Sequence, residues 1–221
     1  VSFDGKSGTF FDLCCDFKEF NDLIWDMRFV EPATDDNAND SSHSGLALIG
    51  FAHNYVQLWK WTSTGEHGAD NTLLLQHVQC KDICLLYCLS FQQEPILESN
   101  LHDIVVGSGT VMNQILLWHP FTEECAKLRA ENKEDQSVCV STTAEVMQRL
   151  IGHGGVLFRI CWTPDSGMIA SVSDDRTVRL WGRQLPSDNG TTHQYKEIGN
   201  CCKKNISNAA QLLTCLRIMI L

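Results

Sequence analysis

Positive charge is scarce in this sequence. Its 221 residues include 17 lysines and arginines against 27 aspartates and glutamates, for a formal net charge of −10. Because the phosphate backbone of nucleic acids attracts basic surfaces, this balance argues against non-specific nucleic-acid binding by the chain as a whole. Any contact with RNA is expected from the more basic residues 141–221 or from a basic partner.

Long apolar runs are also missing. No stretch is long enough to cross a bilayer, and residues 1–11 lack the basic start and apolar run of a secretory signal. The eleven cysteines are an odd number without framework spacing, so we expect reduced thiols and a cytoplasmic protein. Val1 in place of an initiator methionine predicts a piece of a longer chain.

Sequence signatures of catalysis are absent too. There is no glycine-rich phosphate loop, no S-adenosylmethionine-binding pattern after a strand and no metal cluster. Cys80, Cys84 and Cys88 come nearest to a metal site, but zinc sites usually add a second cysteine pair elsewhere. We interpret these three as buried cysteines in or beside a strand. The sequence predicts a protein that is not an enzyme and binds no cofactor or metal.

Helical periodicity over long stretches is rare, whereas short runs of strand-favouring residues recur, which favours an all-β fold. The clearest unit spans residues 150–182 and opens with Gly152-His153. Its three expected strands are separated by turn-forming residues at 164–167 and 174–175; the strands are 156–162, 168–173 and 177–181. Three short strands joined by turns form a meander.

The same rhythm occurs twice upstream. Expected strands lie at 85–91, 104–110 and 114–118 and, before them, at 23–29, 46–51 and 55–59. Each unit closes on a tryptophan, namely Trp59, Trp118 and Trp181. Polar residues 32–44 and 123–143 are expected to form surface loops. No such rhythm follows residue 182, so residues 183–221 are expected to form an irregular tail, mobile over 184–199.

The Gly-His…Trp unit resembles the WD40 family, whose repeats form the blades of β-propellers. The resemblance implies a buried hydrogen-bond network of His153, Ser173 (or Ser171 on the same strand face), Asp175 and Trp181. Gly182 departs from the family, which usually has Asp there. The other two units lack Gly-His, so their networks are expected to be incomplete. A proton-relay role for His153 and Asp175 is the alternative, and the structural role is favoured because no nucleophile accompanies them in a recognisable motif.

A narrower resemblance covers most of residues 12–181. It rests on NDLIWDMRF (21–29), LALIGFAHNYVQLW (46–59), DIVVGSGTVMNQILLWHP (103–120) and RLIGHGGVLFRICW (149–162). These segments are similar to the N-terminal propeller of eukaryotic WD-repeat proteins that partner an FtsJ-like tRNA wobble-nucleotide 2′-O-ribose methyltransferase. The resemblance implies a non-catalytic scaffold that positions tRNA for that enzyme. It also implies a partial propeller in residues 1–182, with blades at about 18–80, 81–150 and 151–182 and, in residues 1–17, the end of a preceding one.

Turns between the second and third strands of each unit are the candidate contact sites, because the rim of a propeller carries its binding surfaces. The predicted partner contacts are His53, Asn54, Asn113, Gln114, Arg176 and Arg179. For the asparagines a purely local role in turn geometry is favoured over partner contact, and for the arginines ordinary solvated charge is favoured. A general adaptor, such as a substrate receptor of a ubiquitin ligase, remains the alternative function.

Overall fold

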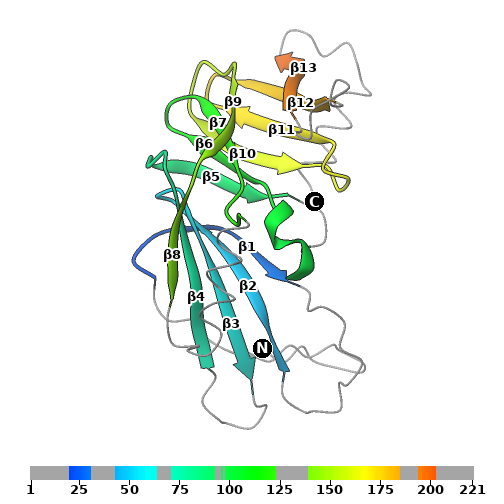
Figure 1. Cartoon of the computed structure of the whole chain (residues 1–221). Coiled ribbons are helices and arrows are strands. Elements are labelled where there is room, and N and C mark those ends of the chain that lie inside the picture. The colour runs from blue at the N-terminus through cyan, green and yellow to red at the C-terminus, as the bar shows by residue number, and fades with distance from the viewer. Residues whose placement is uncertain are drawn as a thin grey trace, which may run out of the picture.

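The described part of the chain forms three β-sheets. The computed structural model describes residues 20–30, 43–63, 71–92, 96, 98–122, 139–184 and 194–202. Apart from a short 3₁₀ helix, η1 (Glu98–Asp103), its regular elements are all strands. Figure 1 shows the first sheet in the lower part of the molecule and the other two above it. The prediction of an all-β fold made of propeller blades is confirmed.

Each sheet contains a meander of four antiparallel strands, and the first sheet has a fifth strand, β8, at its edge. The first sheet contains β1 (Ile24–Val30), β2 (His43–Phe51), β3 (Tyr55–Ser63) and β4 (Asn71–Cys80). The second contains β5 (Leu86–Phe91), β6 (Val106–Thr110), β7 (Gln114–Trp118) and β9 (Val146–Ile151). The third contains β10 (Leu157–Trp162), β11 (Met168–Ser173), β12 (Thr177–Gln184) and β13 (Gln194–Cys202).

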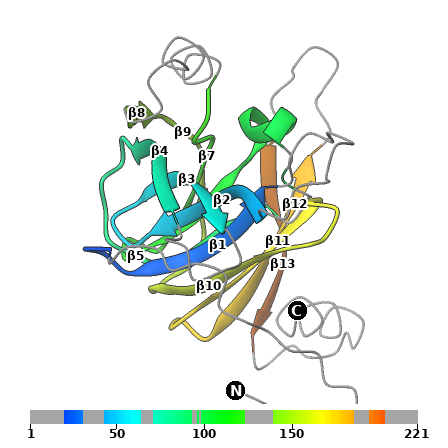
Figure 2. The same cartoon turned by 90° about the horizontal axis from the view of Figure 1, so that it is seen from below.

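The first strands of the three sheets converge. β5 packs against both β1 and β10, and these three strands lie close together in both views of the molecule (Figures 1 and 2). Successive strands of each sheet then lead outward, as in the blades of a propeller.

Alternation along the strands builds two cores, one on each face of the second sheet. Successive residues of a strand point to opposite faces, so in β7 Leu116 and Trp118 pack against the first sheet, whereas Ile115 and Leu117 pack against the third. All four side chains are buried. A strand buried on both faces reads as a continuous apolar run rather than an alternating one, which explains the segment Ile115–Trp118.

Two glycines allow this close packing. A Cβ atom on Gly50 of β2 would lie 2.3 Å from Cδ2 of Leu89 in β5, and one on Gly109 of β6 would lie 2.3 Å from Sγ of Cys88. Gly50 thus lets the first and second sheets approach each other. The Cβ on Gly109 would also meet Leu157 of β10 at 3.1 Å, so the same argument applies to the second and third sheets.

The expected irregular tail is wrong for residues 194–202. They form β13, which pairs antiparallel with β12 and completes the third sheet. Tyr195 explains why this polar segment is ordered: its side chain is buried against Trp162, and its hydroxyl donates to the Ser166 carbonyl at 2.8 Å. Gln148 of β9 also accepts from the Tyr195 N–H at 2.9 Å and donates to its carbonyl at 2.7 Å. Residues 185–193 and 203–221 lie outside the described residues.

The expected surface loop at 123–143 also contains a strand. β8 (Val140–Ala144) adds to the first sheet by pairing in parallel with β4. The chain then turns at Glu145 into β9, the outer strand of the second sheet. One segment therefore borders two sheets. The predicted end of a preceding blade, residues 1–17, lies outside the described residues.

Candidate functional site

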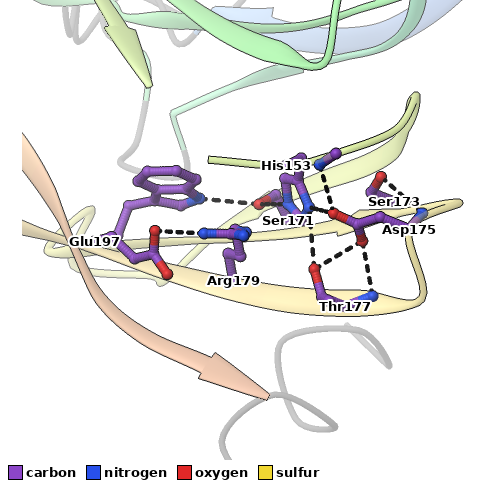
Figure 3. A network of polar contacts seen from close by, with 9 residues as sticks. His153, Ser171, Ser173, Asp175, Thr177, Arg179 and Glu197 are labelled. Carbon is purple, nitrogen blue, oxygen red and sulfur yellow. Dashed lines mark hydrogen bonds and ion pairs between the residues drawn. The ribbon is translucent and has the colours of Figure 1, made fainter. Parts of the chain in front are cut away.

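A chain of polar contacts crosses the third sheet (Figure 3). Trp181 Nε1 donates to Ser171 Oγ at 2.9 Å, and the same oxygen lies 2.8 Å from His153 Nε2. His153 Nδ1 lies 2.9 Å from Asp175 Oδ2. The network thereby ties β12, β11 and the β11–β12 turn to the segment that precedes β10. Ser171, not Ser173, holds the position between the tryptophan and the histidine.

Asp175 is the anchor of this network. Its carboxylate also accepts from the Gly154 N–H at 2.8 Å, from the Thr177 N–H at 2.8 Å and from Thr177 Oγ1 at 2.7 Å. Ser173 accepts from the Asp175 N–H at 3.2 Å and so shapes the turn. Sequence reasoning missed Thr177, although a threonine two residues after an aspartate in a turn is a recognisable local capping pattern.

Burial and hydrogen bonding determine the charges in the network. Burial lowers the pKa of His153, and Asp175 only partly offsets this effect. For Asp175, burial alone would raise the pKa, but hydrogen bonds from Gly154, Thr177 and His153 outweigh it and lower the pKa. A neutral His153 that donates from Nδ1 to Asp175 and accepts from Ser171 at Nε2 satisfies every contact. The pair is thus fully engaged in holding the turn.

The second sheet completes its network with a residue borrowed from the first. Trp118 Nε1 donates to Ser108 Oγ at 3.0 Å, and Ser108 Oγ donates to Asn54 Oδ1 at 2.8 Å. Asn54 belongs to the β2–β3 turn of the first sheet, is fully buried and donates through Nδ2 to the Asp82 carbonyl at 2.7 Å. The expectation that this network is incomplete is therefore wrong for the second sheet, because Asn54 takes the place that His153 takes in the third.

The first sheet has a different arrangement. Trp59 Nε1 donates to Gln57 Oε1 at 2.9 Å, and Gln57 Nε2 lies 3.3 Å from His77 Nδ1. Both partners are in strands β3 and β4 rather than in a turn, so this contact does not join the first sheet to a neighbour.

The three second-to-third-strand turns share one backbone feature. Asn54, Asn113 and Arg176 occupy the same place in the three turns and have φ values of 60°, 64° and 66°. Asparagine tolerates this left-handed conformation better than most residues, whereas an arginine in it has a strained backbone. The predicted local role of the asparagines in turn geometry accounts for this pattern.

The predicted rim residues fall into two groups. Asn54 is fully buried, and Arg179 pairs with Glu197 of β13 at 2.6 Å with only 16% of its side chain exposed. Neither presents a free group to a partner, so the prediction of partner contact is corrected for these two. The other four, His53, Asn113, Gln114 and Arg176, are exposed or half-exposed at the turns.

His53 is held in place by a buried carboxylate. Its Nδ1 lies 3.0 Å from Asp22 Oδ2, and its N–H donates to the same oxygen at 3.1 Å. Burial and the hydrogen bond to Asp22 raise the pKa of the neighbouring Tyr55 to about 12. The imidazole remains 62% exposed, which leaves it available on the surface of the first sheet.

Arg149 of β9 links the turns of the first and second sheets. Its guanidinium pairs with Asp82, next to the β2–β3 turn, and reaches Gln114 Oε1 at the start of β7. We define the rim as His53, Ile83, Met112, Gln114, Arg149 and Arg176. Ile83 and Met112 are 73% and 69% exposed, so the rim combines exposed apolar side chains with basic ones. Such a mixed surface can recognise a macromolecular partner.

The three cysteines that resemble a metal motif are free thiols. Cys80 and Cys88 are buried, and burial raises their pKa to about 11 and about 12, respectively. Burial raises the pKa of Cys84 as well. A protonated thiol is a poor nucleophile and a poor ligand.

Among the described residues, no helix is long and apolar enough to span a membrane.

Comparison with known proteins finds a family match for one part of the chain. Residues 144–182 match the family described as WD domain, G-beta repeat. The matched residues contain β9 of the second sheet and β10, β11 and most of β12 of the third. The match begins at the end of β8 and closes on Trp181-Gly182, so it contains the whole His153–Asp175 network. The predicted WD40 resemblance is confirmed.

The chain is also similar to proteins named tRNA (34-2′-O)-methyltransferase regulator WDR6. It is 26% identical to those of Mus musculus and Homo sapiens over 163 residues, which is 73% of this chain and 11% of each relative. The Drosophila melanogaster protein is 24% identical over 183 residues, 83% of this chain and 16% of the relative. The chain thus spans a small part of the length of these relatives. The narrower resemblance is confirmed as well.

Proposed function

We propose that the chain is a non-catalytic WD-repeat module that assists 2′-O-methylation of the tRNA wobble nucleotide, nucleotide 34. In this proposal it acts in the cytoplasm and positions tRNA for an FtsJ-like partner methyltransferase. The observation that carries the proposal is the similarity over 73% of the chain to proteins named regulators of tRNA 34-2′-O-methylation.

The contacts of the described residues support a scaffold. The His153–Asp175 pair has the geometry of a catalytic dyad, but both ring nitrogens and both carboxylate oxygens are already engaged in contacts that hold the turn. The rim remains as the surface for a partner, because Ile83, Met112 and Arg176 are exposed and His53, although paired with Asp22, keeps 62% of its side chain exposed.

Co-purification tests the proposal. The tagged chain is expressed in eukaryotic cells, and the partner methyltransferase and tRNA are measured in the purified material. Arg176→Glu is expected to lower recovery of the methyltransferase, because it reverses an exposed rim charge. Lys196→Glu, an exposed change on β13 away from the rim, is the matched control and should leave recovery unchanged. Recovery of ubiquitin-ligase subunits in place of the methyltransferase would contradict the proposal.

A further inference from the structure

A pocket of about 570 Å³ lies where the first strands of the three sheets converge. We call it the inner pocket. Each sheet contributes to its wall, and the side chains used below are Asp26 and Arg28 of β1, Tyr87 of β5, and Phe158, Arg159 and Cys161 of β10. Its volume lies in the range of small-ligand sites. It is separate from the rim, which is built from turns rather than from these strands.

Two exposed aromatic rings stand side by side at this pocket. Tyr87 is 43% exposed and Phe158 is 53% exposed, and their ring centroids are 6.2 Å apart at an interplanar angle of 74°. They come from neighbouring sheets, and the alternation of each strand turns them out of the core. Exposed aromatic faces in a pocket provide stacking surfaces for flat, conjugated groups such as nucleobases.

The charge of the pocket is locally positive. Arg159 is exposed, lies beside the Cys161 thiol and has no ion-pair partner among the described residues. The Asp26 carboxylate is already satisfied, because it accepts from the Phe91 N–H at 3.0 Å and the Met27 N–H at 2.9 Å and lies 3.4 Å from Arg28 Nη2. One guanidinium is therefore free to bind an anionic group, and a planar guanidinium suits the oxygens of a phosphate.

We propose that the inner pocket binds one unstacked nucleotide of a single-stranded RNA segment, with the base against Tyr87 and Phe158 and a phosphate on Arg159. This inference rests on the proposed function, which makes RNA the relevant ligand. Single-stranded segments are the parts of an RNA whose bases can be splayed out and stacked on aromatic side chains. The pocket has room for a single nucleotide, and the net charge of −10 disfavours a long electrostatic track.

Fluorescence anisotropy with a labelled single-stranded RNA octamer and the full chain tests this inference. Alanine at Tyr87 or Phe158 is expected to weaken binding about fivefold to a hundredfold, the usual loss for one stacked base. Tyr87→Phe should retain binding, because it keeps the ring. Arg159→Gln should weaken binding and reduce its dependence on salt. All of these side chains are exposed, so the variants are expected to fold.

Matched controls are exposed residues outside the pocket. Phe29→Ala removes a ring that is 65% exposed on β1, and Lys196→Gln removes an exposed cation on β13. Neither should change the affinity for the octamer. Equal losses in the controls, unchanged affinity in the pocket variants, or tighter binding of an acidic tyrosine-rich peptide than of the octamer would overturn the inference.

The outcomes also separate this inference from the proposed function. Normal recovery of the methyltransferase by a chain whose pocket variants bind RNA unchanged overturns the pocket and leaves the proposed function intact. Loss of octamer binding in the pocket variants, in a chain that recovers no methyltransferase, supports the pocket and contradicts the proposed function.

Discussion

The second and third sheets differ in the residue that completes the hydrogen-bond network of a Trp–Ser pair. In both, a tryptophan on the third strand donates to a serine on the second strand. The third sheet completes the contact with its own His153, whereas the second borrows Asn54 from its neighbour. The comparison shows that a Trp–Ser pair does not need a histidine. It also shows that Asn54, an acceptor from the neighbouring sheet, couples two sheets, whereas His153 stabilises only the turn of its own sheet.

Asn54→Ala should have the largest effect of the changes considered. It removes the acceptor of Ser108 and the donor to the Asp82 carbonyl, and it places alanine at a φ of 60°. Lost buried hydrogen bonds and left-handed strain together predict a loss of about 2–5 kcal/mol in the free energy of unfolding. Chemical denaturation measures it. Asn113→Ala, at the same turn position but half-exposed, is the control and should lose clearly less; equal losses would contradict the borrowed network.

Asp175→Ala should come next. It leaves His153, Thr177 and the Gly154 N–H without their acceptor, and a loss of about 1–3 kcal/mol in the free energy of unfolding is expected. The neighbouring Asp174 is exposed, so Asp174→Ala is the control and should change stability little. A thermal melt of Asp175→Ala that matches the parent would show that the network does not hold the turn.

Acidification should weaken the third sheet through His153. Burial lowers the pKa of His153 in the folded state, so as pH falls below about 6.5 the unfolded chain binds a proton that the folded chain resists. Stability is therefore lost as pH falls from 7 toward 5. Burial also lowers the pKa of His77, so the test compares parent and His153→Gln. The variant should show a smaller loss over this range, and an identical pH dependence would contradict the assignment of a neutral His153.

Arg176→Asn should have the smallest effect, and in the opposite direction. Arg176 occupies a φ of 66° that asparagine adopts in the other two turns. A gain of about 0.5–1 kcal/mol in the free energy of unfolding is expected from relief of the backbone strain. Arg176→Ala keeps the strain and should not gain. If both variants gain equally, removal of the charge rather than backbone conformation is responsible.

Local patterns in the sequence were enough to predict most strands. The strands predicted at 114–118 and 168–173 have the same bounds as β7 and β11. They could be predicted because alternating apolar residues, turn residues and a closing tryptophan all lie within one short stretch of sequence. The WD40 resemblance implied the network of His153, Asp175 and Trp181, and Ser171 rather than Ser173 joins it in the structure. These contacts are local or follow a known repeat spacing.

Long-range pairing could not be predicted in this way. β13 is polar, and its order depends on Tyr195 reaching Gln148 of another sheet. β8 pairs in parallel with a strand some sixty residues earlier in the chain. Asn54 resembled an ordinary turn residue, and only the structure shows its side chain against Ser108. Each case depends on a neighbour that no short sequence window contains.

Methyl transfer to tRNA is the measurement that tests the central claim most directly. The partner methyltransferase is assayed for 2′-O-methylation of nucleotide 34 with and without the full chain, and the chain is assayed alone with S-adenosylmethionine and tRNA. The account predicts that the chain raises the rate of the methyltransferase and transfers no methyl group by itself. Methyl transfer by the chain alone, or an unchanged methyltransferase rate in its presence, would contradict the account.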